Sequence, residues 1–233
     1  GLLLRAPRRG WLAALDALVL LAFALLMMTR TLGALAGAAL WARLAAVGLL
    51  CVPLFLMLLA ARGAGESLMD HALLAGVCAL AMLARVSFLD HVSSDYELYL
   101  SDWIAQLGAN SFSACMQQDI GEYNVLYQYL LFLMARLPVP PLYAVKALSF
   151  AGDALLAGAA VSLAGRERGR YALCAVLLLP TCVLNSGMFA QCDSLYAACA
   201  LWGLALALRG HGAGSAACFK RDSAVLRAPN TWM

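Results

Sequence analysis

Charged residues are scarce in this chain: 12% of its 233 residues are Asp, Glu, Lys or Arg, whereas 64% are hydrophobic. Soluble domains are usually about 25% charged and about 45–50% apolar, so both values depart in the direction of a protein that lies in lipid. The formal net charge of +3 is small and the basic residues are scattered, which argues against nucleic acid as a partner. The composition predicts an integral membrane protein in contact with membrane lipids.

Several motifs of metal and nucleotide sites are also missing. None of the eight cysteines belongs to a Cys-x-x-Cys pair, and most lie in apolar runs, where a free cysteine behaves as a small hydrophobic residue. The chain contains no His, Asp and Glu spacing typical of a metal site, no glycine-rich phosphate loop and no convincing short repeat. We therefore expect no metal and no other cofactor.

Long hydrophobic runs recur along the chain. A spanning helix needs roughly 20 mostly apolar residues. Pro53 and Pro180 lie inside two of the runs, which a bundle tolerates when neighbouring helices satisfy the freed backbone groups. The sequence therefore predicts an all-α, polytopic transmembrane helix bundle within residues 1–210, with about six spans near 11–28, 44–61, 69–87, 141–164, 171–189 and 194–209.

The N-terminal arginines bear on orientation. They precede the first apolar run, an order that also resembles a signal peptide, but this run exceeds the usual ~7–15-residue signal core and more spans follow, which favours a retained helix. Lys and Arg collect on the cytoplasmic side of a membrane. A cytoplasmic N-terminus places eight arginines inside, Arg5, Arg8, Arg9, Arg62, Arg166, Arg168, Arg170 and Arg209, and four outside, Arg30, Arg43, Arg85 and Arg136.

A long loop, about residues 88–140, then lies on the outer side. A loop of this length without structure of its own is unusual, and two short amphipathic helices are predicted in it. The first starts at a capping box of Ser94 and Glu97 and ends near Asn110. The second runs from about Tyr123 to Leu137. Such helices lie in the membrane interface, with their Trp and Tyr side chains at headgroup depth.

The last segment, residues 211–233, is small, polar and basic and contains no spanning run. A polytopic protein can end in such a tail. Disorder, truncation and a shifted reading frame are three further explanations of the abrupt change, so this segment is left out of the predicted fold.

Four groups of polar residues exceed what apolar packing requires. Each also has a purely structural explanation, because a carboxylate is favoured in the first turn of a helix and tyrosines anchor helices at the membrane interface. Asp95 and Tyr96 lie at the start of the first loop helix, and Glu122, Tyr123 and Asn124 lie in a short run at the second. Lys146 and Asp153 lie in the fourth span, and Gln191 and Asp193 lie before the last span.

Lys146 and Asp153 lie seven residues apart, on one face of the same predicted span. Asp153 is 12 residues past Pro141, which at the helical rise places it about 18 Å along the helix, near the middle of the bilayer. A charge there needs a partner or a water-filled cavity. A buried ion pair between the two residues is one explanation, and a position of Lys146 beside a lipid phosphate is the other.

Taken together, the motifs resemble a known family. The run Ser-Asp-Tyr-Glu-Leu-Tyr-Leu-Ser-Asp-Trp at 94–103 resembles the first outer loop of GT-C superfamily glycosyltransferases, and is most similar to the bacterial proteins related to the PIG-V type of GPI mannosyltransferase. The resemblance covers about residues 85–209 and continues, in the family's order and spacing, with Glu-Tyr-Asn at 122–124, the Lys146-to-Asp153 helix, Pro-Thr at 180–181, Asn-Ser at 185–186 and Gln-Cys-Asp-Ser-Leu-Tyr at 191–196.

Two departures from the family pattern stand out. Phe189-Ala190 occupies the place of the usual Trp-Gly, and the expected Lys-x-Gln helix has no counterpart, because Lys220 is followed by Arg221 and Asp222. An inactive, truncated membrane fragment is therefore one alternative. A transporter or flippase is another, since membrane charges also line substrate paths.

The resemblance implies transfer of a sugar, with mannose expected, from a polyprenyl-phosphate donor to an acceptor on the outer face of the bacterial cytoplasmic membrane. A sugar hydroxyl is a poor nucleophile, so a carboxylate that accepts its proton accelerates the reaction. Asp95 is the expected catalytic base, and Lys146 the expected cation for the leaving phosphate. The other expected substrate-binding residues are Tyr96, Glu122, Tyr123, Asn124, Asp153, Gln191 and Asp193.

Overall fold

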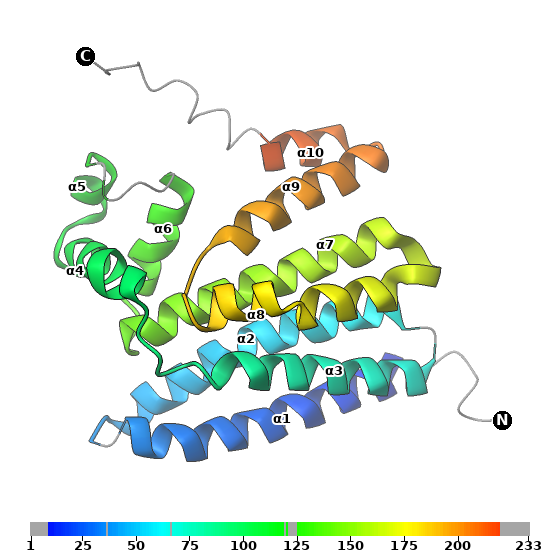
Figure 1. The fold of residues 1–233 in the computed structure, drawn as a ribbon, viewed down its shortest axis with the longest axis horizontal. Helices are drawn as coiled ribbons and strands as arrows, with labels where there is room; N and C mark the ends of the chain where they lie inside the picture. Colours follow the sequence, from blue (N-terminus) through cyan, green and yellow to red (C-terminus); the bar gives the residue numbers. More distant parts are fainter. Residues whose placement is uncertain (1–8, 36, 66, 119, 121–124, 220–233) are drawn as a thin grey trace.

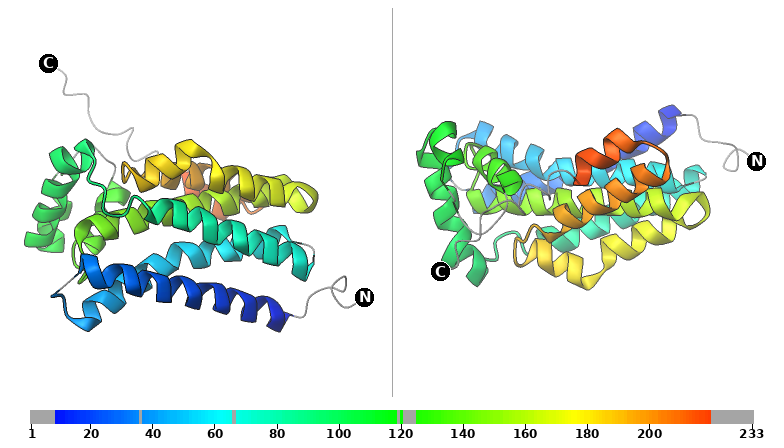
Figure 2. Two further views of the ribbon diagram at one scale, coloured as in Figure 1. Left: turned by 60° about the horizontal axis from the view of Figure 1, so that its bottom comes forward. Right: turned by 90° about the horizontal axis from the view of Figure 1, so that it is seen from above.

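The computed structural model describes residues 9–35, 37–65, 67–118, 120 and 125–219. Every regular element in this part of the chain is a helix, so the predicted all-α class is confirmed. Long helices lie side by side along one direction, and the short helices of the predicted outer loop gather at one end (Figure 1). Two further views show the same arrangement (Figure 2).

Four helical segments are long and apolar enough to cross a membrane. They are most of α1 (Arg9–Ala34), α2 (Leu40–Ala64), α3 (Leu68–Val86) and the first part of α7 (Pro141–Leu178). A fifth crossing is possible where the second part of α7 continues into α8 (Pro180–Gly187) across a 47° bend. The last apolar helix, α9 (Asp193–Leu208), has 16 residues, fewer than the roughly 20 that a spanning helix needs.

Local sequence signals explain where these helices begin and turn. The Ser67 side chain accepts a hydrogen bond from the Asp70 backbone N–H (3.1 Å), and the Asp70 carboxylate accepts one from the Ser67 N–H (3.2 Å), which forms a capping box at the start of α3. Pro141 and Pro180 are the first residues of α7 and α8, where a missing N–H costs nothing. Gly165 has φ of 73°, a left-handed conformation that glycine adopts readily, and it lets α7 turn back.

Helix α2 lies at the centre of the bundle and contacts α1, α3 and α7. Its buried face includes Leu50, Leu54, Met57, Leu58 and Ala61, which pack against buried residues of the neighbouring helices. In contrast, α1 keeps large apolar side chains on the outside, including Leu18, Leu21 and Leu25. Exposed apolar surface of this kind on a long helix is what contact with lipid requires.

The outer loop differs in detail from the prediction. Ser94 is not the helix cap, because the backbone N–H of Tyr96 donates to Ser93 Oγ (3.3 Å) and that of Glu97 to Ser93 O (3.0 Å). The helix therefore starts one residue earlier, and passes through a π-helical turn, η2 (Tyr96–Leu100), before α4 (Ser101–Ala109). A short helix that the sequence did not predict, α5 (Phe112–Met116), follows.

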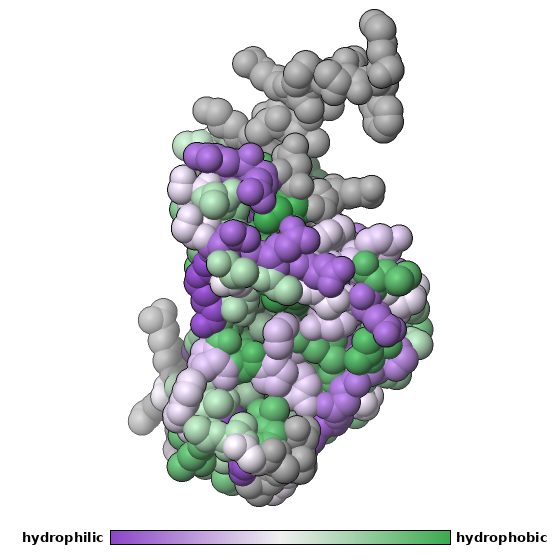
Figure 3. All heavy atoms as spheres, turned by 90° about the vertical axis from the view of Figure 1, so that its left-hand side faces the viewer, coloured by the Kyte–Doolittle hydropathy of each residue, from purple (hydrophilic) through white to green (hydrophobic). Residues whose placement is uncertain are grey.

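The second predicted loop helix is α6 (Val125–Met134). Its expected start at Tyr123 lies outside the described residues, and it ends three residues before Leu137. The end of the molecule where the short loop helices lie carries many hydrophilic residues on its surface (Figure 3). Part of the predicted polar tail is ordered, because Gly212–Phe219 forms α10, which packs against α9. The rest of the tail, residues 220–233, lies outside the described residues.

Candidate functional site

Two segments that are distant in the sequence meet at the loop end of the bundle. One leads from α3 into η2, and the other connects α8 to α9. The Gln191 side-chain amide donates to the Asp95 carboxylate (2.6 Å), and Ser93 Oγ donates to the carbonyl of Phe189 (3.2 Å). Each bond joins residues that are 96 positions apart. The structure therefore brings together Asp95 and Gln191, two of the residues that the sequence singled out.

The segment that carries Gln191 has an unusual backbone. Ala190 has φ of 59°, although it is not glycine, and it is completely buried. A left-handed conformation costs an alanine about 1–2 kcal/mol and a glycine almost nothing. Ala190 occupies the position where the resembled family usually has glycine, so this backbone conformation is compatible with the family motif. The backbone N–H of Gln191 donates to the carbonyl of Asn185 (3.0 Å), which holds the turn in place.

Asp95 and Tyr96 are half-buried at the start of the loop helix. Among the described residues, Gln191 is the hydrogen-bond partner of Asp95, and it contacts Oδ2. The other carboxylate oxygen, Oδ1, is left for a proton or a substrate hydroxyl. Partial burial raises the pKa of the Tyr96 phenol above its usual value, so this hydroxyl is neutral at physiological pH and can donate a hydrogen bond.

Lys146 does not pair with Asp153, contrary to one of the two explanations of their spacing. Its side chain is completely buried, and its ammonium group donates to the carbonyls of Phe88 and His91, the latter at 2.6 Å. A long lysine side chain can extend along the helix toward the polar end of a bundle. Lys146 therefore fastens the segment before Asp95 to α7, and in this conformation it is not exposed to a lipid phosphate.

Asp153 pairs instead with Arg85 of α3, whose Nε lies 2.7 Å from Asp153 Oδ2. Both side chains are completely buried. Ser186 Oγ donates to the same carboxylate at 2.6 Å, and Ser194 Oγ donates to its other oxygen. We call Arg85, Asp153, Ser186 and Ser194 the Asp153 cluster. It connects α3, α7, α8 and α9, and Arg85 is the charged partner that an aspartate in the middle of an apolar helix needs.

The role of Arg85 was not predicted from the sequence, where this arginine was interpreted only as a topology signal. Arg85 lies inside a predicted span, so the rule that an intramembrane charge needs a partner applies to it as much as to Asp153. Its NH1 also donates to the carbonyls of Ala81 and Leu177, each at 2.9 Å. The sequence signal for the pair was the presence of one basic residue, Arg85, and one acidic residue, Asp153, in two different predicted spans.

The remaining candidate residues divide into two groups. Asp193 is exposed in the first turn of α9, where it accepts a hydrogen bond from the Asn185 amide (3.2 Å), an arrangement that its structural explanation anticipated. Glu122, Tyr123 and Asn124 lie outside the described residues.

Asp90 is a further residue at this end that the sequence did not single out. Its carboxylate forms an ion pair with Arg30 (3.0 Å) and accepts a hydrogen bond from the Tyr143 hydroxyl. Partial burial raises the pKa of Asp90, but the bonds from Tyr143 and Arg30 outweigh this effect and hold that pKa below its usual value. Asp90 thus links α1, α7 and the segment that leads to Asp95.

A second buried aspartate lies at the opposite end of the bundle. Asp16 of α1 accepts from Arg62 Nε of α2 (2.6 Å) and lies 2.7 Å from His71 Nε2 of α3. We call these three residues the Asp16 cluster. No motif indicated it, although a lone acid in the first apolar run and a histidine in the third were visible in the sequence.

In the part of the chain that the structure describes, no group of three or more His, Cys, Asp and Glu side chains is arranged to hold a metal ion. The loop end instead offers a half-buried carboxylate, oriented by an amide and adjacent to a phenol. Such a constellation can accept a proton from a hydroxyl and position a polar substrate. Comparison of the chain with protein-family models, with curated proteins and with solved structures gives no match in any of the three.

Proposed function

We propose that this protein is a membrane glycosyltransferase that transfers a sugar, with mannose the favoured one, from a polyprenyl-phosphate donor to a hydroxyl acceptor on the outer face of a bacterial cytoplasmic membrane. The observation that carries the proposal is the hydrogen bond between Asp95 and Gln191. It joins the two ends of the motif series on which the resemblance to GT-C glycosyltransferases rests.

In the proposed reaction Asp95 is the catalytic base. An acceptor hydroxyl attacks C1 of the donor sugar, and its proton passes to Asp95 Oδ1. The bond between C1 and the phosphate oxygen breaks, and its electron pair leaves with the polyprenyl phosphate. Gln191 keeps Oδ2 occupied, so that the free oxygen is oriented toward the substrate. Placing the base in this way typically contributes a factor of about 10²–10⁴ to the rate.

Lys146 is proposed here to position the polypeptide and not to contact the leaving phosphate. Its bonds to the carbonyls of Phe88 and His91 make it a positioning residue for the segment before Asp95. Asp153 has a comparable part, because its bonds to Ser186 and Ser194 fix both sides of the turn that carries Gln191. Tyr96, Asp193 and the run 122–124 are the proposed contacts with the donor and acceptor.

The proposed topology has six crossings and a cytoplasmic N-terminus. The bent pair of the second part of α7 with α8 is the fifth crossing, and α9 is the sixth. This topology puts η2 and α4–α6 on the outer side, at the depth where a lipid-linked donor presents its sugar. Since α4 carries Trp103 and Tyr99 lies in η2, the loop has the aromatic residues typical of a membrane interface.

The catalytic proposal is tested by Asp95→Asn in the complete membrane protein, assayed with radiolabelled polyprenyl-phosphate mannose. We expect a loss of about 10²–10⁴-fold in transfer rate, because the amide cannot accept the proton. Asp102→Asn is the matched control, since Asp102 is an exposed carboxylate on α4, and it should retain activity. Normal transfer by folded Asp95→Asn protein would reject Asp95 as the base, and donor movement across the membrane without transfer would favour a transporter.

The topology is tested separately with Ser94→Cys, because Ser94 is exposed beside Asp95. A membrane-impermeant maleimide should label this cysteine from outside intact cells, above the background of the native cysteines in the unchanged protein. Labelling only after the cells are opened would place the proposed site in the cytoplasm, where the outer-face reaction is impossible.

A further inference from the structure

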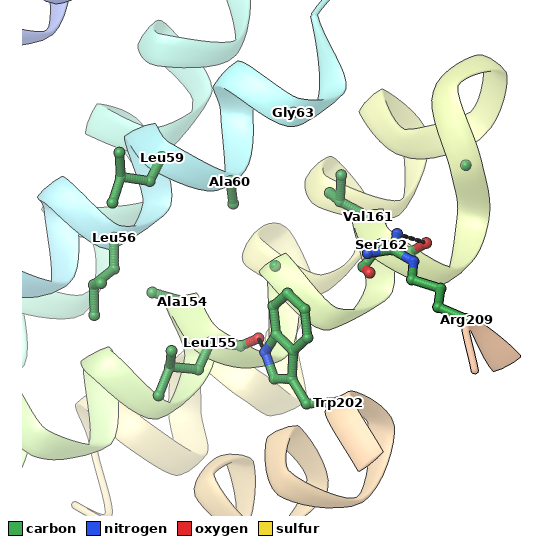
Figure 4. A pocket seen from close by; sticks show the side chains of 12 residues that line it. Leu56, Leu59, Ala60, Gly63, Ala154, Leu155, Val161, Ser162, Trp202 and Arg209 are labelled. Carbon is green, nitrogen blue, oxygen red and sulfur yellow. Dashed lines mark hydrogen bonds between the residues drawn. The ribbon is translucent and has the colours of Figure 1, made fainter. Parts of the chain in front are cut away.

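A cavity of about 490 Å³ lies between α2, α7 and α9 (Figure 4). Most of its surface is apolar. Trp202 of α9 forms one wall, and its indole N–H is fixed by a hydrogen bond to the carbonyl of Leu155 (3.0 Å). Ala60 of α2, Ala154, Ser162 and Gly165 of α7, and Arg209 at the end of α9 also line it.

The length of this cavity matches one leaflet of a bilayer. Its lining on α7 extends from Ala154 to Gly165, which at the helical rise is about 16 Å. The hydrocarbon core of a bilayer is about 30 Å thick, so one leaflet contributes about 15 Å. A cavity of this length that lies along a spanning helix suits an acyl chain better than a compact polar molecule.

The polar groups of the cavity are concentrated at one end. Arg209 is exposed there, and its NH2 donates to the carbonyl of Ser162 (3.0 Å). The Ser162 hydroxyl oxygen is buried and has no hydrogen-bond partner among the described residues. A buried hydroxyl without a partner costs free energy, and a ligand oxygen beside Arg209 would remove that cost. Arginine binds phosphate through several N–H groups at once.

Two other grooves on the bundle provide a comparison. One, of about 380 Å³, lies between α1 and α2 with Leu20 and Phe55 in its lining, and the other, of about 390 Å³, lies between α1 and α3 with Trp11 and Met69. Their described lining residues include no charged side chain. These grooves have no charged side chain that could contact a lipid headgroup, whereas Arg209 lines the cavity.

We propose that the cavity between α2, α7 and α9 binds one acyl chain of an anionic phospholipid, whose phosphate contacts Arg209 and Ser162. The positive-inside rule places this end of the bundle at the cytoplasmic surface, where anionic lipids attract basic side chains. The proposal does not depend on the transferase reaction, because the cavity lies in the half of the bundle away from Asp95 and shares no lining residue with the Asp95 site.

The test measures quenching of Trp202 fluorescence by lipids with brominated acyl chains, added to the full chain in detergent. The signal of Trp202 is the difference between the unchanged protein and Trp202→Phe. Brominated phosphatidylglycerol should quench this signal at concentrations about fivefold lower than brominated phosphatidylcholine does, the advantage expected from one arginine near a membrane surface. Arg209→Gln should abolish that difference.

Controls separate charge at the cavity from charge in general. Arg168→Gln removes an exposed arginine that does not line the cavity, and it should retain the preference for phosphatidylglycerol. Ala60→Leu and Ser162→Leu fill the cavity from two different helices and should weaken quenching by both lipids. Equal quenching by the two lipids, or an unchanged preference in Arg209→Gln, would overturn the proposal. Polyprenyl phosphate is added as a competitor in the same assay. If a smaller amount of it than of brominated phosphatidylglycerol already displaces the brominated lipid, the proposal is overturned and the cavity binds an isoprenoid lipid instead.

Discussion

Asp153 and Asp16 are both buried aspartates in apolar helices, with exposed fractions of 0% and 2%, but their surroundings differ. The cation that pairs with Asp153 is Arg85, whose side chain is completely buried, whereas the Arg62 side chain that pairs with Asp16 is 34% exposed. Asp16 also contacts His71, a second polar partner, at 2.7 Å. The Asp153 cluster is thus closed to water, and the Asp16 cluster is open at one side.

The positions of the two clusters explain this difference. Arg62 lies in the last turn of α2 and His71 close to the start of α3, so the Asp16 cluster is at one end of the bundle. Asp153 lies in the middle of a spanning segment. Removing one member of an ion pair is most costly where neither water nor a second partner can replace it. The two clusters therefore predict unequal effects of matched substitutions.

The largest expected effect is that of Arg85→Met. This substitution leaves a carboxylate in the closed Asp153 cluster without its cation, so we expect the free energy of unfolding to fall by about 3–5 kcal/mol. The measurement is unfolding of the purified protein by SDS in mixed micelles, followed by tryptophan fluorescence. The double variant Arg85→Met, Asp153→Leu removes both charges and should recover most of the loss. A double variant as unstable as the single one would contradict the ion-pair explanation.

Helices α7 and α9 pack closely beside the Asp153 cluster. A Cβ atom added to Gly152 would lie 2.9 Å from the Leu195 side chain and 3.1 Å from its backbone nitrogen. Gly152→Ala should therefore destabilise the protein by about 1–3 kcal/mol, measured in the same way. Gly48→Ala on α2 is the matched control, because nothing lies within 4 Å of its added Cβ, and it should be neutral or stabilising. Equal effects of the two would show that this contact is not tight.

Arg62→Met is the counterpart of Arg85→Met in the open cluster. Asp16 keeps His71 as a partner, and water reaches the place that Arg62 vacates. We expect a loss of about 1.5 kcal/mol in the free energy of unfolding, the lower end of the range for one hydrogen bond to a charged group. A loss as large as that of Arg85→Met would remove the distinction between the two clusters.

The smallest expected effect concerns Asp90, which is exposed. Its pKa in the folded protein is lowered, so its ion pair and hydrogen bond stabilise the protein above the unfolded-state pKa, about 4. This contribution is lost as the pH falls through the lowered folded-state pKa. At pH 7, Asp90→Asn should reduce the free energy of unfolding by about 0.2–1 kcal/mol, as for other exposed pairs. The difference between the two proteins should shrink toward pH 3 and in high salt.

The sequence by itself determined that this protein is helical, that several of its helices are long and apolar enough to cross a membrane, and where those helices run. These properties depend on residues that are close together in the chain. The length and composition of an apolar run determine whether it forms a long helix, and nearby proline and glycine residues determine where that helix begins or turns. It also singled out Asp95 and Gln191, whose contact the structure shows.

Tertiary structure alone decided which charges meet. The pairing of Asp153 with Arg85 rather than Lys146, the Asp16 cluster and the bond from Gln191 to Asp95 each depend on which helices are neighbours and on how each is rotated about its axis. The helix start at Ser93 rather than Ser94 has the same origin, because the carbonyl of Phe189 holds Ser93 Oγ from another segment. Partners of this kind are distant in sequence, and no local pattern of residues contains that information.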